Sequence, residues 1–289
     1  NATLLTNDVI EELYKNHIGI GISIDGDRKC HDLQRTFVSG KGSYDTVKKN
    51  LLQAQRYYKN KIGTITTITK QTAVHIEKII EHLVLDLHIS NIKLNFVHAS
   101  TYTHGQNQCL NTQEIADTEL CILYKIIELQ ERGYDVMEHN IFIKLKNLLF
   151  REYADICLSC GCCGGKKMIV FDMDGNIYPC ELTDDASFVI GSIYKKESLI
   201  EQIKMTIDKD KAFFKMKKAV ECEKCYWKFF CRGGCTVRAL SEKRQMEVID
   251  IDHIECAINQ VLYPALMELV LRKPHIVNQM LGEDLLVDE

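Results

Sequence analysis

Three apolar runs in the first half of the chain have the composition of buried strands. They are IGIGISIDG at residues 18–26, IGTITTITK at residues 62–70, and NIKLNFV beginning at Asn91. Each run is rich in isoleucine, valine or threonine, which favour the extended conformation. Continuous apolar runs without alternation are typical of strands covered on both faces. The pattern therefore predicts three buried strands.

Between these runs, apolar residues recur at helical spacing. One helix is expected after Thr6 or Asn7, a second over residues 46–60, and a third carrying Ile76 to Leu83 on one face; a longer helix runs from about Thr112 to Gly133. Strands that alternate with amphipathic helices predict a parallel α/β sheet, either part of a barrel or an open sheet. Ligands should then bind at the carboxyl ends of the strands.

After about residue 150 the pattern changes, and cysteine becomes the dominant feature. Ten of the 13 cysteines fall between Cys157 and Cys256, so a domain boundary is predicted near residue 150. Apolar residues up to Phe171, a turn at Asp174-Gly175 and a second short run predict a β-hairpin that brings Cys180 beside the upstream thiols. The alternative is a hairpin with incidental buried cysteines, which five cysteines within CLSCGCCGGKKMIVFDMDGNIYPC make less attractive.

Composition narrows the class of protein. The formal net charge of -4, without a long basic run, argues against a nucleic-acid surface, and no apolar run is long enough to suggest a membrane span. No secretory signal opens the chain, so a cytoplasmic protein is expected, in which clustered cysteines indicate metal binding or catalysis. The early cysteines, Cys30, Cys109 and Cys121, are scattered and are assigned no function.

The densest cysteine run is CEKCYWKFFCRGGC, with the spacing C-x2-C-x5-C-x3-C; twenty residues separate its last cysteine from Cys256. Zinc is one candidate, because short paired spacings build tetrahedral zinc sites. At least seven thiols are concentrated here among aromatic residues, which is more than one zinc ion needs. Four thiolates per cubane and an apolar shell favour iron–sulfur clusters.

These motifs resemble the seven-cysteine pattern of the SPASM domain of radical S-adenosylmethionine enzymes. The first half agrees: NATLL at Asn1 and SIDG at Ser23 to Gly26 resemble segments of that family's barrel. Together the two halves cover nearly the whole chain. The residues that fit the SPASM pattern in order are Cys163, Gly175, Cys180, Cys222, Cys225, Cys231, Cys235 and Cys256.

The resemblance implies two auxiliary 4Fe-4S clusters with interlocked ligands. The outer cluster would be held by Cys222, Cys225, Cys231 and Cys256.

For the inner cluster, the resemblance implies Cys235, Cys180 and thiols from the Cys157 to Cys163 segment. Cys160 resembles the first inner ligand, and either Cys162 or Cys163 follows it; we assign Cys163. In some relatives one iron of this cluster is open to substrate, so the number of ligands is not fixed by the resemblance.

The S-adenosylmethionine contacts implied by the resemblance lie at Ser23, Asp25 and Gly26. Ser23 resembles a ribose contact, whereas Asp25 could instead cap the turn. The family's catalytic cluster is held by C-x3-C-x2-C, which this sequence lacks; Arg238 stands where Cys231-x3-Cys235 would need the third cysteine. We therefore expect an N-terminally truncated chain that does not cleave S-adenosylmethionine by itself.

The expected architecture is a partial (β/α) radical SAM barrel over residues 1–150, lacking its first strands. A SPASM domain over 151–265, with a β-hairpin and helices, and a helical tail over 266–289 would follow. In full-length form, with S-adenosylmethionine and a third 4Fe-4S cluster, such enzymes modify a peptide or protein. They form thioether or carbon–carbon crosslinks, or oxidise cysteine or serine of a sulfatase to formylglycine.

The resemblance also suggests a catalytic residue and partners. Glu181 directly follows Cys180, where formylglycine-forming relatives have an aspartate that accepts the substrate's proton. The alternative for Glu181 is a solvated turn residue. Expected partners are the peptide or protein substrate and an electron donor such as flavodoxin or ferredoxin, with neither nucleic acid nor membrane. Two other hypotheses stay open: a non-catalytic iron–sulfur electron-transfer or scaffold protein, and a zinc-stabilised binding module.

Overall fold

The computed structural model divides the chain into two compact units. Unit 1 comprises Asn1–Val97, Gln108–Leu145 and Val261–Glu289, and unit 2 comprises His98–Asn107 and Lys146–Gln260. The domain boundaries expected at residues 150 and 265 stay a prediction. The residues that the structure describes are 1–98, 106–152, 157, 162–165, 167–183, 186–208, 220–243 and 251–282.

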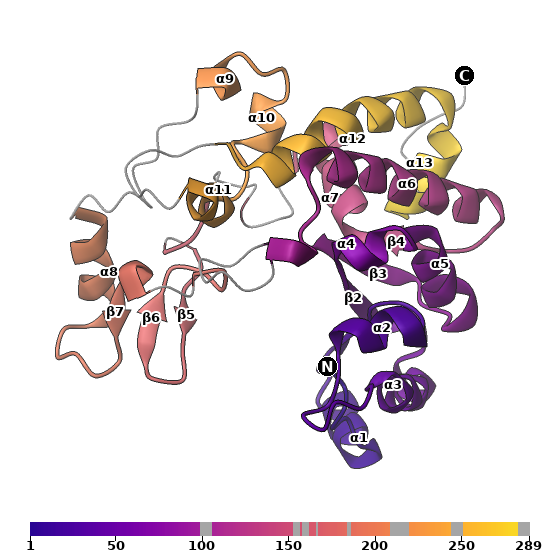
Figure 1. The fold of residues 1–289 in the computed structure, drawn as a ribbon, viewed down its shortest axis with the longest axis horizontal. Helices are drawn as coiled ribbons and strands as arrows, with labels where there is room; N and C mark the ends of the chain where they lie inside the picture. Colours follow the sequence, from indigo (N-terminus) through magenta and orange to yellow (C-terminus); the bar gives the residue numbers. More distant parts are fainter. Residues whose placement is uncertain are drawn as a thin grey trace. The chain divides into compact units, whose positions relative to one another are not determined.

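The core of unit 1 is a parallel sheet with the strands in sequence order (Figure 1). Its strands are β1 (Gly21–Ser23), β2 (Gly63–Ile68), β3 (Asn91–Phe96) and β4 (Met137–Glu138). All three neighbouring pairs are parallel, so the predicted parallel α/β sheet is confirmed. The strand expected over residues 18–26 is shorter than predicted. Ile18 is half exposed and its carbonyl accepts a hydrogen bond from the Tyr58 hydroxyl instead of a strand partner.

Helices of unit 1 connect and cover these strands. The predicted helix after Thr6 is α1, and the long predicted helix is α6, which begins with a capping box between Asn111 and Glu114. The structure also contains a π-helical turn, His82–Asp86, which continues α5. The bounds are α1 (Asn7–Lys15), α2 (Arg28–Gln34), α3 (Tyr44–Tyr58), α4 (Lys70–Ala73), α5 (Ile76–Glu81), α6 (Thr112–Glu131) and α13 (Pro274–Leu281). Helices α7 (His139–Phe150) and α12 (His253–Arg272) each have residues in both units.

Unit 2 contains a small antiparallel sheet. Strands β5 (Val170–Phe171) and β6 (Asn176–Tyr178) pair across the predicted turn, where the Asp172 carboxylate accepts hydrogen bonds from two backbone amides. A third strand, β7 (Gly191–Ser192), pairs with β6. The helices of this unit are α8 (Leu199–Asp208), α9 (Val220–Glu223), α10 (Lys228–Cys231) and α11 (Thr236–Lys243).

Helix α12 differs from the sequence expectation in one respect. By length and composition alone it could cross a membrane, although no such run was expected. One helix of this kind is weak support for a membrane span, because core helices pass the same test. Leu262, Tyr263 and Leu266 of α12 are fully buried whereas Met267 and Leu271 are exposed, so one face of the helix packs against the protein.

Candidate functional site

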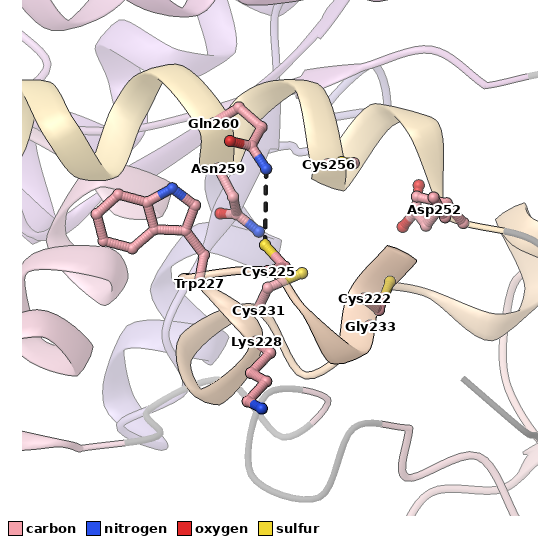
Figure 2. Close-up of a pocket in the computed structure, with 11 residues that line it drawn as sticks. Cys222, Cys225, Trp227, Lys228, Cys231, Gly233, Asp252, Cys256, Asn259 and Gln260 are labelled. Carbon is pink, nitrogen blue, oxygen red and sulfur yellow. Dashed lines mark hydrogen bonds between the residues drawn. The ribbon is translucent and has the colours of Figure 1, made fainter. Parts of the chain in front are cut away.

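Four cysteines of unit 2 line one cavity, which we call the outer thiol site. They are Cys222, Cys225, Cys231 and Cys256, the four residues assigned to the outer cluster from the sequence. The cavity encloses about 430 Å³ of space, part of it open to solvent. Figure 2 shows Cys225 and Cys231 on the α9–α10 segment, facing the helix that carries Cys256 and Gln260.

Short hydrogen-bonded turns hold three of these cysteines. The Cys225 amide donates to the Cys222 carbonyl at 3.3 Å, and the Cys231 amide donates to the Trp227 carbonyl at 2.8 Å. The chain then reverses through Arg232, Gly233 and Gly234, all of which have positive φ angles. Two consecutive glycines adopt this conformation readily, so the sequence between Cys231 and Cys235 permits the tight reversal.

The surroundings of the outer thiol site are apolar with a few polar groups. Trp227 lines the cavity, and its ring lies 6.2 Å from that of Phe230. The Gln260 amide donates to the Cys225 sulfur at 3.6 Å. Burial raises the pKa of the Cys256 thiol, so its metal-free form stays protonated and metal binding must displace that proton.

In donor type alone, four soft thiolates suit an iron–sulfur cluster and a zinc ion alike. Within the part of the chain that the structure describes, no three Cys, His, Asp or Glu side chains are close enough to hold one ion.

A second group of cysteines, the inner thiol site, comprises Cys162, Cys180 and Cys235. Cys162 and Cys235 pack against a buried cluster formed by Cys180, Phe188 and Val237. Burial raises the pKa of Cys180 to about 12. A negative charge on the Cys235 thiol would also oppose ionisation of Cys180. The Leu182 amide lies 3.2 Å from the Cys180 sulfur and stabilises its thiolate form. The hairpin therefore brings Cys180 to Cys235, as the resemblance implies.

The remaining inner-site assignments are less direct. Cys160 lies outside the described residues. Cys163 is fully buried and disulfide-bonded, a state in which it is not a thiolate ligand, so its assignment requires the reduced thiol. Of the adjacent pair, Cys162 is the one that packs with Cys180 and Cys235. The Glu181 side chain is exposed, and the inner-site ligand set and the role of Glu181 both stay predictions.

In unit 1, the residues expected to contact S-adenosylmethionine lie at the carboxyl end of β1. Ser23 is the last residue of the strand and is partly buried. Asp25 is 1% exposed; its carboxylate accepts hydrogen bonds from Arg35 Nε at 2.6 Å and from the Thr67 amide at 2.9 Å. Asp25 thus joins the ends of β1 and β2 to the residue that follows α2. This contact set gives Asp25 a structural task, and the cofactor contacts stay a prediction.

Gly26 completes this turn, and its substitution should be strongly destabilising. Its φ is +97°, and an added Cβ would lie 2.7 Å from Ile79 Cγ1. We expect Gly26→Ala to combine a left-handed backbone penalty of about 1–2 kcal/mol with displacement of α5. Gly133→Ala is the matched control, because Gly133 has φ +85° and no atom within 4 Å of the added Cβ. Hydrogen exchange of β1 and α5 measures the difference; equal effects of both variants would contradict it.

Sequence reasoning missed the acidic residue beside the thiols. Asp252 lines the outer cavity, is 1% exposed, and accepts a hydrogen bond from the Cys235 amide at 2.7 Å. The sequence DHIE at Asp252 to Glu255 has the D-x-x-E spacing of a helix start, so it could have indicated the helix cap just before Cys256. That signal indicates the cap but says nothing of the distant contact with Cys235.

No protein-family model matches the chain. It is 25% identical over 241 residues to a cysteine-type anaerobic sulfatase-maturating enzyme of Clostridium novyi, and 23% identical over 253 residues to a serine-type enzyme of Bacteroides thetaiotaomicron. Each alignment covers 81% of this chain; they cover 62% and 59% of the two relatives, so this chain matches less than two thirds of their length.

Two solved structures show the same fold. An anSMEcpe structure with bound AdoMet and a Cp18Cys peptide has a TM-score of 0.78 at 19% identity, covering 94% of this chain and 74% of that one. Streptococcus suis SuiB bound to the precursor peptide SuiA has a TM-score of 0.56 at 18% identity, covering 86% and 56%. The resemblance drawn from the cysteine spacing is thus confirmed: the chain's homologues are anaerobic sulfatase-maturating enzymes, and its mixed α/β fold with a parallel sheet matches the structures of two radical SAM SPASM enzymes, anSMEcpe and SuiB.

Proposed function

We propose that this chain is the sheet-and-SPASM part of a radical SAM maturase that oxidises a cysteine or serine in a peptide or protein. The observation that carries the proposal is the outer thiol site, where four cysteines from separate sequence segments line one cavity. The homology to cysteine-type and serine-type sulfatase-maturating enzymes supports the reaction class. Thioether or carbon–carbon crosslinking is the second candidate, supported by the likeness to SuiB, whose structure holds a precursor peptide.

Two auxiliary 4Fe-4S clusters are proposed, one at each thiol site. Cys222, Cys225, Cys231 and Cys256 would hold the outer one. Bound clusters of this type supply one-electron acceptors whose potential depends on burial and on hydrogen bonds to sulfur. This chain's residues would contribute to both features: the apolar ring of Trp227 lines the outer cavity, and Gln260 donates a hydrogen bond to the sulfur of Cys225.

The inner site would use Cys180 and Cys235, joined by Cys160 and by Cys162 or Cys163. Cys180 is held at the end of the hairpin by packing against the buried side chains of Phe188 and Val237. Cys235 is held by the hydrogen bond that its amide donates to Asp252. In the same proposal, S-adenosylmethionine binds at the carboxyl end of β1, with Ser23 at the ribose and Gly26 leaving the turn free of a side chain. The partial barrel is the part of the fold that would present it.

Glu181 is proposed as the general base that accepts the substrate's proton. It follows Cys180 directly, and its side chain is exposed, which leaves it accessible to a substrate in this structure. In a longer enzyme that contains this chain and a C-x3-C-x2-C motif, Glu181→Gln should lower product yield about 100-fold or more, the scale of general-base catalysis. S-adenosylmethionine cleavage should continue, because the variant keeps the substrate and cofactor sites. Glu223→Gln, another exposed acidic residue of unit 2, is the control, and full product yield from Glu181→Gln would end the assignment.

The reaction class is tested with that longer enzyme and two peptides that differ only in cysteine or serine at one position. Reduced enzyme should form 5′-deoxyadenosine and convert at least one peptide to an aldehyde, trapped with a hydrazide probe. Peptide that loses hydrogen without becoming an aldehyde would support crosslinking instead. Deoxyadenosine without any change in either peptide would contradict both. This chain by itself is expected to form no deoxyadenosine.

A further inference from the structure

One buried residue, Asp252, accepts a hydrogen bond from the backbone of a cysteine in each thiol site. Its side-chain Oδ2 accepts a hydrogen bond from the amide of Cys235, in the inner site, at 2.7 Å. Its backbone carbonyl accepts a hydrogen bond from the amide of Cys256, in the outer site, at 2.9 Å. Asp252 also lines the outer cavity, where Figure 2 shows it at the start of the helix that carries Cys256. A single residue therefore links the two sites through short, direct contacts.

The charge of Asp252 is matched by Arg238 on α11. Arg238 Nε and Nη2 both donate to Asp252 Oδ2, at 3.0 and 2.7 Å, and Nη2 also reaches Glu255 Oε2 at 3.3 Å. Asp252 is 1% exposed, so without a cation beside it the carboxylate would be strongly disfavoured. Because Arg238 lies on α11 and Glu255 on α12, the ion pairs tie the first turns of two helices together.

Each of these helices begins beside a ligand cysteine. The Cys235 carbonyl accepts from the Ala239 amide, so Cys235 immediately precedes the first turn of α11. Asp252 Oδ1 accepts from the Glu255 amide at 3.2 Å and caps α12, whose first turn leads into Cys256. The cap and the ion pair therefore fix the helix starts at which the two cysteines lie, Cys235 just before α11 and Cys256 in the first turn of α12.

The approach of the two segments leaves no room for a side chain between them. Gly234, the residue before Cys235, has φ +72°, and a Cβ there would lie 2.7 Å from Asp252 Oδ2. Asp252 is thus in close contact with the loop that carries the inner-site ligand as well as with its own helix.

We propose that Asp252 and Arg238 are positioning residues that set the distance between the inner and the outer thiol site. The inference rests on the proposed function in that the two sites are taken to hold clusters. Neither Asp252 nor Arg238 is proposed as a metal ligand. The pair locks the backbone of Cys235 against the cap of α12, so that the site containing Cys235 and the site containing Cys256 cannot move independently.

The first test is amide hydrogen exchange, read by mass spectrometry on the anaerobically reconstituted chain. Asp252→Ala should speed exchange about tenfold or more at Cys235 and in the first turn of α12, because it removes a hydrogen bond to a charged acceptor. Asp252→Asn, which keeps an acceptor for the cap, should restore most of the protection in α12 but not at Cys235. The hairpin at residues 170–178 should be unchanged in both variants.

The matched control is Lys125→Gln in unit 1. Lys125 is a buried cation between two carboxylates, Glu81 at 2.8 Å and Glu128 at 2.7 Å, as Arg238 is between Asp252 and Glu255. The Lys125→Gln variant should leave hydrogen exchange at Cys235 and in α12 unchanged. Unaltered exchange at Cys235 in Asp252→Ala, or the same acceleration in Lys125→Gln, would overturn the proposal.

The second test reads the spacing itself. Arg238→Lys keeps the positive charge but loses the two-pronged contact. It should retain the iron content of the unmodified chain while changing the magnetic dipolar broadening between the reduced clusters; full iron with unchanged broadening would contradict the proposal. Metal analysis of the unmodified chain tests the proposed clusters separately from the positioning role of Asp252 and Arg238. Absence of iron there refutes the proposed function, whereas the exchange data still decide whether Asp252 holds the two segments together.

Discussion

Cys256→Ala is expected to remove about four of the roughly eight irons that two cubanes contribute, and to leave the rest in place. Cys256 is in the outer cavity with Cys222, Cys225 and Cys231, whereas Cys180 packs with the inner-site cysteines. Because each proposed cluster would draw its thiolates from its own site, losing one ligand should empty that site selectively. Iron and sulfide analysis of the anaerobically reconstituted variant measures this.

The companion variant Cys180→Ala should remove the other half of the iron. After reduction, the electron paramagnetic resonance spectrum of Cys180→Ala should keep the signal of the outer cluster and lack that of the inner cluster. The spectrum of Cys256→Ala should keep the inner signal and lack the outer one. Cys121→Ala is the control, because that cysteine lies exposed on α6 in unit 1 and should leave the iron content unchanged. Loss of both signals in each variant would mean that the division of the cysteines into two sites is wrong.

Arg35→Gln is the second large effect, and it concerns the stability of unit 1. Arg35 pairs with the buried carboxylate of Asp25, which also accepts the Thr67 amide. Removing one partner leaves a buried charge unpaired, which costs about 3–5 kcal/mol. Hydrogen exchange of β1 and β2 should report this loss directly. A single unfolding midpoint would be harder to interpret, because the chain has two compact units.

The matched control for Arg35 is Arg28→Gln. Arg28 pairs with Asp45 at the surface, with 64% and 63% of the two side chains exposed. Exposed pairs of this kind contribute about 0–1 kcal/mol, so the control should hardly change exchange in β1 and β2. Similar losses from both arginine variants would show that the Asp25 contact does not hold these strands together.

Much of unit 1 could be predicted because its strands and helices repeat over many residues. The apolar run at residues 62–70 and the helical stripe over 46–60 each provide enough positions to define a period. Strands β4 and β7 have two residues each, too few to show any alternation. The π-turn at His82–Asp86 was also missed, because the apolar stripe of α5 simply continues through it.

The candidate site was predictable where ligands recur at fixed spacing, as in the outer set from Cys222 to Cys256. Sequence spacing cannot separate the adjacent Cys162 and Cys163, because the local turn decides which sulfur faces Cys180. Nor could it reveal Asp252, whose contact with Cys235 joins residues 17 positions apart through folding alone. Contacts of this type depend on how two helix starts pack, which no local pattern encodes.

The most direct measurement of the central claim is iron, acid-labile sulfide and zinc in the anaerobically reconstituted, unmodified chain, with Mössbauer spectra of the same sample. The two proposed clusters predict about eight irons and eight sulfides per chain, all in 4Fe-4S clusters, and little zinc. About four irons per chain, or one zinc for each chain with iron near zero, would contradict the account.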